Sequence, residues 1–196
     1  LAATRHARDA GVDALLLVDP YYNGPSSIEI RKEYIAPIAE SFPDLTIIPY
    51  VIPGRTGTQL LPEDLALLHD RYQNVNCVKE ATGNLDNMRR TRVVCGDNYH
   101  IFSGDDALVL DMMTDPAIRA CGLISVASNI APGFTTELVQ LVLDNRTEEA
   151  KILFRKLEPL FRLTTVTTRE KTPYGENSCK AREQRRSETG TLPRGV

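Results

Sequence analysis

The 196-residue sequence has few of the residues that build metal or redox sites. It contains three histidines and four cysteines, no C-x-x-C pair and no H-E-x-x-H motif. Such sparse, scattered residues do not predict a zinc site or a dense disulfide framework. Unpaired cysteines are typical of a reducing compartment, so we expect a cytoplasmic protein that binds no metal.

Positive charge and long apolar runs are scarce as well. The formal net charge is −3, so no basic surface for nucleic acid is expected. No apolar run approaches the roughly 20 residues of a membrane-spanning helix. The first residues, LAATRHARDAG, lack the apolar core and cleavage pattern of a signal peptide. We therefore expect a globular protein with one sizeable core and neither a nucleic acid nor a membrane as partner.

Short apolar runs nevertheless alternate with amphipathic segments along most of the chain. Several runs are apolar almost throughout, as strands buried on both faces of a parallel sheet are. Helix starts are indicated at Ser26, at Pro62 and after Asn84, and three more helices are expected further on. This alternation predicts βα units in an open sheet or a closed barrel. The strand candidates are 13–22, 45–51, 74–81, 99–106 and 121–128.

The position of the polar residues favours the barrel. No G-x-G-x-x-G follows the first run and no P-loop occurs, so a nucleotide-binding open sheet lacks its main signature. Polar side chains gather where the runs end, and in a (β/α)8 barrel those strand ends form the active-site face. A typical barrel has about 250 residues and eight strands, so about three strands are expected upstream of this chain. Residues 1–163 are predicted to form the C-terminal portion of such a barrel, about strands 4 to 8.

The run NVNCVKEATG, residues 74–83, ends in a lysine, Lys79. Burying an ammonium costs several kcal/mol, so a lysine at the end of an apolar strand is unusual unless it is paired or neutral. Burial lowers the pKa of a lysine and makes it an amine nucleophile. The alternative is that Lys79 pairs with Glu80 on the surface.

Four segments in a fixed order carry a resemblance to a known family: PYVIPGRTG, VKEATGNL, SGDDAL and GLISVASNIAP. From about residue 5 to about residue 163 the chain resembles the dihydrodipicolinate synthase branch of the pyruvate-dependent class I aldolases, a superfamily that also contains N-acetylneuraminate lyase. The GRTG segment favours the synthase branch. The resemblance implies a cytoplasmic homotetramer, a dimer of dimers. It would condense pyruvate with aspartate 4-semialdehyde in diaminopimelate and lysine biosynthesis, with a covalent lysine imine and no cofactor.

The resemblance also implies roles for six residues. Lys79 would form the imine with pyruvate, Tyr50 would transfer protons, and Tyr22 would complete the proton relay of a neighbouring subunit. Alternatively, Tyr50 is a core tyrosine without a catalytic role, and Tyr22 packs at an interface between subunits. Arg55 would bind the carboxylate of the aldehyde substrate, or it is a loop arginine that bonds nearby carbonyls. Gly104 and the Ile124 main chain would border the pyruvate.

Two departures from the family pattern leave alternatives open. Val51 stands where a small polar residue is usual, which keeps open a different pyruvate-dependent aldolase acting on a sugar acid or hydroxy-keto acid. The family's Gly-Thr-Thr-Gly-Glu segment, which binds the pyruvate carboxylate, is expected upstream of Leu1. A catalytically inactive barrel remnant that binds a partner through its unpaired edges is the third hypothesis.

Two further segments need an interpretation. Asp105 and Asp106 of SGDD have no third ligand nearby, so helix capping by Asp105 or Asp106 is expected in place of a metal site. Residues 164–196 have few apolar residues and no periodicity, which predicts a disordered or aberrant tail. Removing one G from permissible codons for REQRRSE converts it to Arg-Asn-Asn-Ala-Val-Pro, so the tail from about Glu183 is hypothesised to be a frameshift product. Sequencing the encoding nucleic acid tests this, and codons incompatible with the shift would end the idea.

Overall fold

The computed structural model of the chain describes residues 1–164, in which strands and helices alternate. The predicted tail, apart from Thr164, lies outside the described residues. No helix in residues 1–164 is both long and apolar enough to cross a membrane.

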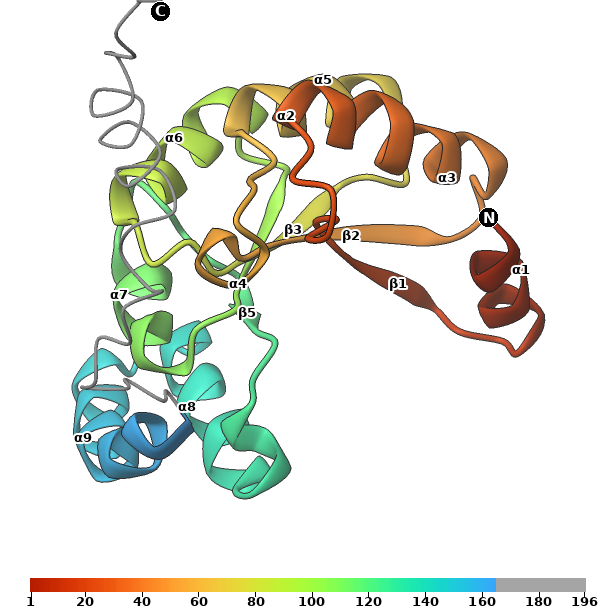
Figure 1. The fold of residues 1–196 in the computed structure, drawn as a ribbon. Helices are drawn as coiled ribbons and strands as arrows, with labels where there is room; N and C mark the ends of the chain where they lie inside the picture. The colour runs from red at the N-terminus through yellow and green to blue at the C-terminus, as the bar shows by residue number, and fades with distance from the viewer. Residues whose placement is uncertain (165–196) are drawn as a thin grey trace, which may run out of the picture. The chain divides into compact units, whose positions relative to one another are not determined.

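Five parallel strands form one sheet in this part of the chain (Figure 1). Their spatial order is their order in the sequence, and every neighbouring pair is parallel. A nucleotide-binding doubly wound sheet reverses its strand order at a switch point, whereas a barrel wall does not. The sheet is therefore part of a (β/α)8 barrel, as predicted. The strands are β1 (Ala14–Val18), β2 (Thr46–Val51), β3 (Cys77–Glu80), β4 (His100–Ser103) and β5 (Gly122–Leu123).

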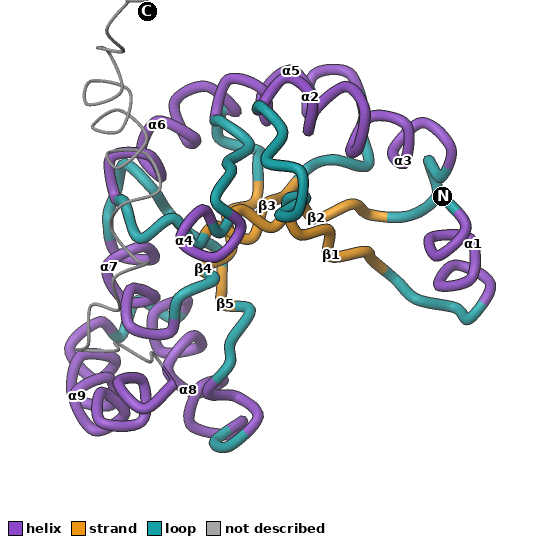
Figure 2. The backbone as a smooth tube through the Cα atoms, in the orientation of Figure 1, coloured by secondary structure: helices purple, strands orange, loops and turns teal. Residues whose placement is uncertain are grey.

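Helices follow the strands and lie along one side of the sheet (Figure 2). The helical segments predicted between the runs are all present, and η1 lies within the first of them. Two short elements, α4 and η3, were not predicted. The helices are α1 (Ala2–Asp9), α2 (Ser27–Glu29), η1 (Ile30–Ile35, a π-helix), α3 (Ala36–Ser41), α4 (Pro53–Thr56), α5 (Pro62–Arg71), α6 (Leu85–Cys95), η2 (Asp106–Leu108), α7 (Val109–Thr114), η3 (Ala127–Asn129), α8 (Pro132–Leu143) and α9 (Thr147–Thr164).

Local sequence signals account for the helix starts. Ser26 and Glu29 form a capping box, in which each side chain bonds the backbone of the other residue. Pro62 occupies the first turn of α5, where its missing N–H costs nothing. The Asn84 side chain accepts hydrogen bonds from the amides of Asp86 and Asn87 at the start of α6. These signals place the helices, and so the strand ends between them.

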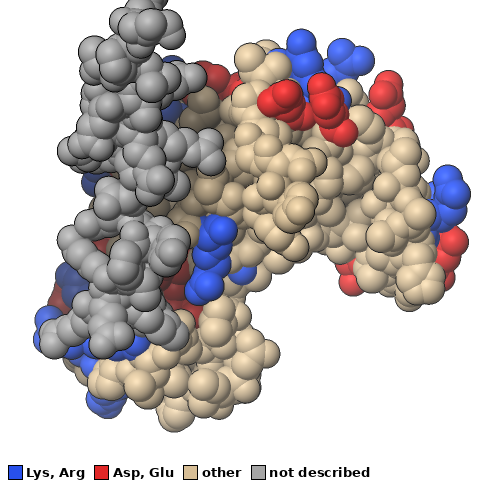
Figure 3. All heavy atoms as spheres, viewed as in Figure 1, with Lys and Arg blue, Asp and Glu red and all other residues tan. Residues whose placement is uncertain are grey.

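The two faces of the sheet differ in burial. On the helix side, Ile47, Val78 and Ile101 are fully buried in the core. On the other side, Leu16 is 45% exposed and Val18 is 37% exposed. The expectation that the strands are buried on both faces is therefore wrong for β1, because no described residue covers its inner side. The hollow on the side away from the helices is lined mainly by uncharged side chains (Figure 3).

Element boundaries differ from the predicted runs at the strand ends. The run 121–128 contains only two strand residues, after which the chain forms η3. The apolar run in the sequence extends past the strand because η3 also contributes a core residue, Ala127. Helix α9 is described as far as Thr164, one residue beyond the predicted boundary at 163.

Candidate active site

Lys79 and Tyr50 meet on the inner face of the sheet. The register of β2 and β3 pairs these two residues, and both side chains point to the same side. The Lys79 Nζ lies 4.1 Å from the centroid of the Tyr50 ring. Lys79 is only 7% exposed. The sheet thus holds an amine against a phenol in a largely dry position.

Glu80 does not pair with Lys79. It is fully buried on the opposite face, where its carboxylate accepts hydrogen bonds from the Thr82 amide at 2.7 Å and from the Asn87 Nδ2 at 3.0 Å. Successive residues of a strand point to opposite faces, so a neighbour in sequence is not a neighbour in space. The surface ion-pair alternative for Lys79 is therefore wrong.

Burial changes the proton affinity of both side chains. Desolvation lowers the pKa of Lys79, and the carboxylate of Asp106 partly opposes this shift. Desolvation raises the pKa of Tyr50; the positive charge of Arg55 opposes that change and the negative charge of Asp105 adds to it. Burial therefore shifts Lys79 toward the neutral amine and Tyr50 toward the protonated phenol.

Arg55 is presented by α4, directly after β2. Pro53 begins this four-residue helix, and Gly57 ends it with a left-handed φ of 67°, which glycine adopts without strain. The Arg55 side chain is exposed at the same end of the sheet as Tyr50, close enough to act on its pKa. The structure thus places the exposed guanidinium of Arg55 at the edge of the site.

Gly104 lies directly against the stem of Lys79. Its amide donates to the Glu80 carbonyl at 2.7 Å. A Cβ built at this position would lie 3.0 Å from the Lys79 Cε and 2.8 Å from the Ala81 Cβ, closer than side chains pack. Ile124 follows β5, and its amide donates to the Ser103 carbonyl at 2.9 Å. Both residues therefore lie at the same strand ends as Lys79.

Tyr22 stands apart from these five residues. It lies in the loop after β1 and is 92% exposed. Together with Tyr21 and Tyr34 it borders a separate cleft of about 310 Å³. The structure brings Lys79 and Tyr50 together, whereas the Tyr22 side chain is exposed to solvent in this chain.

Sequence reasoning missed a buried carboxylate at the end of β1. Asp19 is fully buried; its Oδ2 accepts a hydrogen bond from the Leu60 amide at 3.0 Å, and its Oδ1 has no partner. Burial raises the pKa of Asp19 to about 6, the Leu60 amide opposes this, and the nearby Glu80 adds to it. The signal in the sequence was a charged residue ending an apolar run, the same signal that identified Lys79.

The prediction that Asp105 or Asp106 caps a helix is confirmed by Asp105. Asp105 caps η2 by accepting a hydrogen bond from the Ala107 amide at 2.9 Å. Asp106 instead bonds the amides of Val126 and Ala127, which lie after β5. Residues 1–164 contain no group of three or more His, Cys, Asp or Glu side chains placed to hold a metal ion.

Val51 does not face the site. It follows Tyr50 on β2, so it points to the helix side, where it is fully buried in the core. Because Val51 points away from the site, it is not in a position to contact a second substrate there. Its apolar character is explained by packing.

Comparisons with known proteins agree on one family. The model of the dihydrodipicolinate synthetase family matches residues 1–173. A 4-hydroxy-tetrahydrodipicolinate synthase from Methanothrix thermoacetophila is 40% identical over 166 residues, which are 84% of this chain and 54% of that protein. The chain thus spans about half the length of the curated relatives it matches.

Solved structures resemble the described fold. Dihydrodipicolinate synthase from Aquifex aeolicus is 33% identical with a TM-score of 0.79, covering 86% of this chain and 56% of that one. The chloride-inhibited enzyme from Acinetobacter baumannii, complexed with pyruvate, is 30% identical with a TM-score of 0.76, covering 100% of this chain and 62% of that one. The similarity includes both sequence and fold, and the chain belongs to the dihydrodipicolinate synthetase family.

Proposed function

We propose that the protein is a lyase of lysine and diaminopimelate biosynthesis that condenses pyruvate with aspartate 4-semialdehyde to 4-hydroxy-tetrahydrodipicolinate. The observation that carries this proposal is the nearly buried Lys79 amine against the Tyr50 ring. The family membership of the chain and the names of its relatives support the choice of reaction.

Lys79 begins the reaction as a nucleophile. Its neutral amine attacks the keto carbon of pyruvate, and the carbonyl oxygen takes up a proton. Loss of that oxygen as water leaves an imine between the Lys79 nitrogen and pyruvate. The lowered pKa of Lys79 raises the fraction of neutral amine at a given pH, which is the form that reacts.

Tyr50 supplies and removes protons during these steps. Because burial raises the pKa of Tyr50, its phenol carries a proton that it can donate to the departing oxygen. The protonated imine is a cation, and the ring face 4.1 Å from the lysine nitrogen is a position where a cation is stabilised. Loss of a proton from the pyruvate methyl group then gives an enamine, which attacks the aldehyde carbon.

The remaining residues position the two substrates. Gly104, which has no side chain, leaves room beside the Lys79 stem for the pyruvate, and the Ile124 main chain borders it. Arg55 offers a planar guanidinium to the carboxylate of the incoming aldehyde substrate. No cofactor is needed, because the lysine imine itself accepts the electrons of the breaking C–H bond.

Assembly completes the proposal. We place the enzyme in the cytoplasm as a homotetramer, a dimer of dimers, in which Tyr22 reaches the site of a neighbouring subunit. The 92% exposure of Tyr22 leaves its side chain accessible to a neighbouring subunit, which supports this role.

Reductive trapping tests the imine. Incubation with pyruvate and cyanoborohydride is expected to add the mass of a three-carbon carboxylic acid to the peptide that contains Lys79. Lys151, a half-exposed lysine of α9 paired with Glu148, serves as an internal control, and a Lys79→Arg variant should gain no mass at residue 79. Because relatives are about twice as long, the longest available form of the protein should be tested beside this chain. An unmodified Lys79 in both forms would refute the proposal.

Turnover identifies the second substrate. Coupled assays with pyruvate and aspartate 4-semialdehyde are expected to give product, while sugar-derived aldehydes are not. Imine formation without turnover of aspartate 4-semialdehyde, but with turnover of another aldehyde, would assign a different aldolase of the same superfamily.

A further inference from the structure

The carboxylate of Asp106 joins the ends of two strands. Asp106 lies just after β4 and is almost fully buried. Its Oδ1 accepts a hydrogen bond from the Ser125 hydroxyl, and its Oδ2 accepts from the amides of Val126 and Ala127 at 3.1 and 3.0 Å. One side chain thus takes up three donors of the segment 125–127, about 20 residues further along the chain.

The ladder between β4 and β5 stops before this segment. Strands β4 and β5 pair over two residues, Phe102 with Gly122 and Ser103 with Leu123. One more hydrogen bond, from the Ile124 amide to the Ser103 carbonyl, ends the ladder. Beyond Ile124, the Asp106 carboxylate takes the place of the missing strand partner.

Hydrogen bonds between Ser125 and Ser128 connect this segment to η3. The Ser128 amide donates to the Ser125 Oγ at 2.8 Å, and the Ser128 hydroxyl donates to the Ser125 carbonyl at 3.1 Å. Ser125 therefore both donates to Asp106 and accepts from η3. Fixing Ser125 fixes the turn that begins at Ile124, whose main chain borders the proposed pyruvate site.

Asp106 also acts on Lys79 through its charge. The Tyr50 ring from β2 lies 4.1 Å from the Lys79 Nζ, and Gly104, two residues before Asp106, packs against the Lys79 stem. The negative charge of Asp106 opposes the lowering of the pKa of Lys79. Glu80 is on the other face, and Arg55 and Asp105 act on Tyr50. Asp106 is thus the charged group whose removal should change the proton affinity of Lys79.

We propose that Asp106 is a positioning residue with two functions: its carboxylate fastens the segment 125–127 across the ends of β4 and β5, and its negative charge adjusts the reactivity of Lys79. It acts through other residues and does not touch the reacting atoms. The inference deepens the proposed function and rests on it for its catalytic consequence, whereas the contacts themselves do not depend on it.

Two substitutions separate the two functions. In Asp106→Asn, the side-chain oxygen can still accept from the amides of Val126 and Ala127, and the new NH2 group can donate to the Ser125 hydroxyl. The asparagine thus keeps the hydrogen bonds to the segment 125–127 and loses the negative charge. Asp106→Ala removes both the hydrogen bonds and the charge. An Asp13→Asn variant, which loses an exposed carboxylate before β1, is the matched control for a change of charge.

Hydrogen exchange tests the fastening without any substrate. The amides of Val126 and Ala127 are expected to exchange at least about tenfold faster in Asp106→Ala than in the parent protein, because they lose their acceptor. In Asp106→Asn and Asp13→Asn their exchange should be unchanged. If Asp106→Ala does not fold, Ser125→Ala removes one of the three bonds and should give a smaller acceleration. Equal protection at 126 and 127 in every folded variant would overturn the fastening.

Competitive acetylation across a pH series tests the charge. The midpoint for labelling of Lys79 is expected to move to lower pH in Asp106→Asn, since a negative charge that favours the ammonium is gone. Labelling of Lys151 should not move, and neither residue should respond to Asp13→Asn. An unchanged midpoint for Lys79 in folded Asp106→Asn would overturn this function.

Pyruvate trapping then separates the inference from the proposed function. Asp106→Ala should raise the pyruvate concentration needed for half-maximal trapping, while Asp106→Asn should change the pH profile of trapping more than that concentration. If the parent protein forms no imine, the proposed function fails, and the exchange and acetylation results still decide what Asp106 does to its neighbours.

Discussion

At residue 104 the site depends on the absence of a side chain. The backbone of Gly104 passes so close to the Lys79 stem that a methyl group would lie 3.0 Å from the Lys79 Cε. The neighbouring Ala81 Cβ and Glu80 carbonyl oxygen, at 2.8 and 3.1 Å, cannot move as freely as a lysine stem. Glycine here is therefore explained by a close approach and not by an unusual backbone angle.

Gly104→Ala is expected to displace the Lys79 amine. We predict that imine formation with pyruvate slows by about 100-fold, the order expected from a misplacement of about 1 Å. Overpacking should also lower the free energy of unfolding by about 1–3 kcal/mol. Trapping rates and urea denaturation measure the two effects.

Gly133→Ala is the matched control, because a Cβ at Gly133 meets no atom within 4 Å. This change in α8 should leave trapping unaltered and stabilise the protein by up to about 1 kcal/mol. Equal trapping rates for the two alanine variants would contradict the account of Gly104.

Asp19 makes stability depend on pH in an unusual direction. In the folded protein its pKa is about 6, above the ordinary value for aspartate. As pH rises from about 4 to about 6, the unfolded chain loses this proton before the folded chain does. The contribution of Asp19 to the free energy of unfolding is therefore fully present at low pH and is lost as pH rises toward 6. Above that pH the folded protein holds a buried, ionised carboxylate, which is unfavourable.

Asp19→Asn removes the charge and keeps an acceptor for the Leu60 amide. One pKa unit corresponds to about 1.4 kcal/mol, so the variant is predicted to be about 2–3 kcal/mol more stable than the parent protein above pH 7. Near pH 4 the two proteins should differ little. Urea unfolding at pH 4.5, 6 and 8 measures this, and a stability difference that does not change with pH would rule it out.

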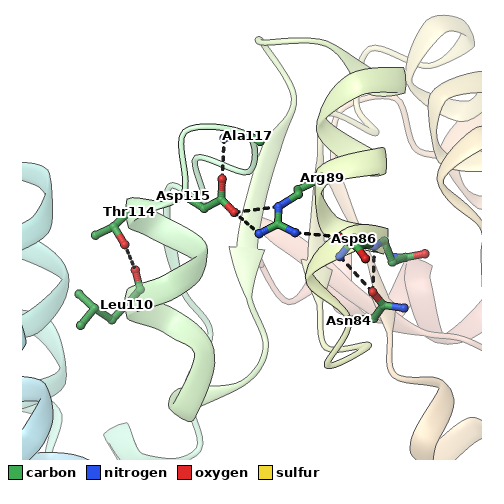
Figure 4. A network of polar contacts seen from close by, with 8 residues as sticks. Asn84, Asp86, Arg89, Leu110, Thr114, Asp115 and Ala117 are labelled. Carbon is green, nitrogen blue, oxygen red and sulfur yellow. Dashed lines mark hydrogen bonds and ion pairs between the residues drawn. The ribbon is translucent and has the colours of Figure 1, made fainter.

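At the scale of elements, two arginines of α6 hold it to the segment after α7 in different ways. Arg89 is 42% exposed and forms ion pairs with Asp86 at 2.7 Å and Asp115 at 2.8 Å (Figure 4). Arg92 is almost fully buried, and its guanidinium donates to carbonyls at 2.6–3.2 Å. Those carbonyls belong to Gly96, Asp97, Tyr99, Ile118 and Arg119.

We predict a large difference between two leucine substitutions. Arg92→Leu leaves buried carbonyls without donors and should lower the free energy of unfolding by about 3–5 kcal/mol. Arg89→Leu removes exposed ion pairs, which are worth about 0–1 kcal/mol and are screened by salt. Denaturant unfolding at low and high salt measures both. A salt-dependent loss in Arg92→Leu, or equal losses in the two variants, would contradict this ranking.

At the scale of the described unit, β1 and β5 are the two ends of the sheet. The inner side of β1 exposes Leu16 and Val18, and an edge strand with exposed apolar side chains favours association with another chain. Burying one such side chain is worth about 1.5–3 kcal/mol, or about tenfold or more in an association constant.

Leu16→Lys is therefore predicted to weaken self-association of the 196-residue chain by at least about tenfold in protein concentration, measured by light scattering after size exclusion. Leu67→Lys is the control, because Leu67 is also half exposed but lies on α5, on the helix side of the sheet. The same weakening in both variants would show that general hydrophobicity, and not the inner side of β1, drives association.

Much of the fold could be predicted because its signals are local. The run that ends at Lys79 is apolar over neighbouring residues, and Ser26, Pro62 and Asn84 act within one turn of the helices they begin. Asp106 could not be assigned in the same way. Its partners lie about 20 residues away, and nothing within SGDD distinguishes it from Asp105.

The sequence by itself determined the alternation of strands and helices, the parallel sheet and the placement of a lysine at a strand end, because periodicity and capping depend on neighbouring residues. Only the tertiary structure decided that Tyr50 lies beside Lys79, that Val51 points into the core, and that Asp106 reaches across to the segment after β5. Strand register and long-range hydrogen bonds follow from how whole elements pack, and shifting a strand by one residue would exchange its two faces.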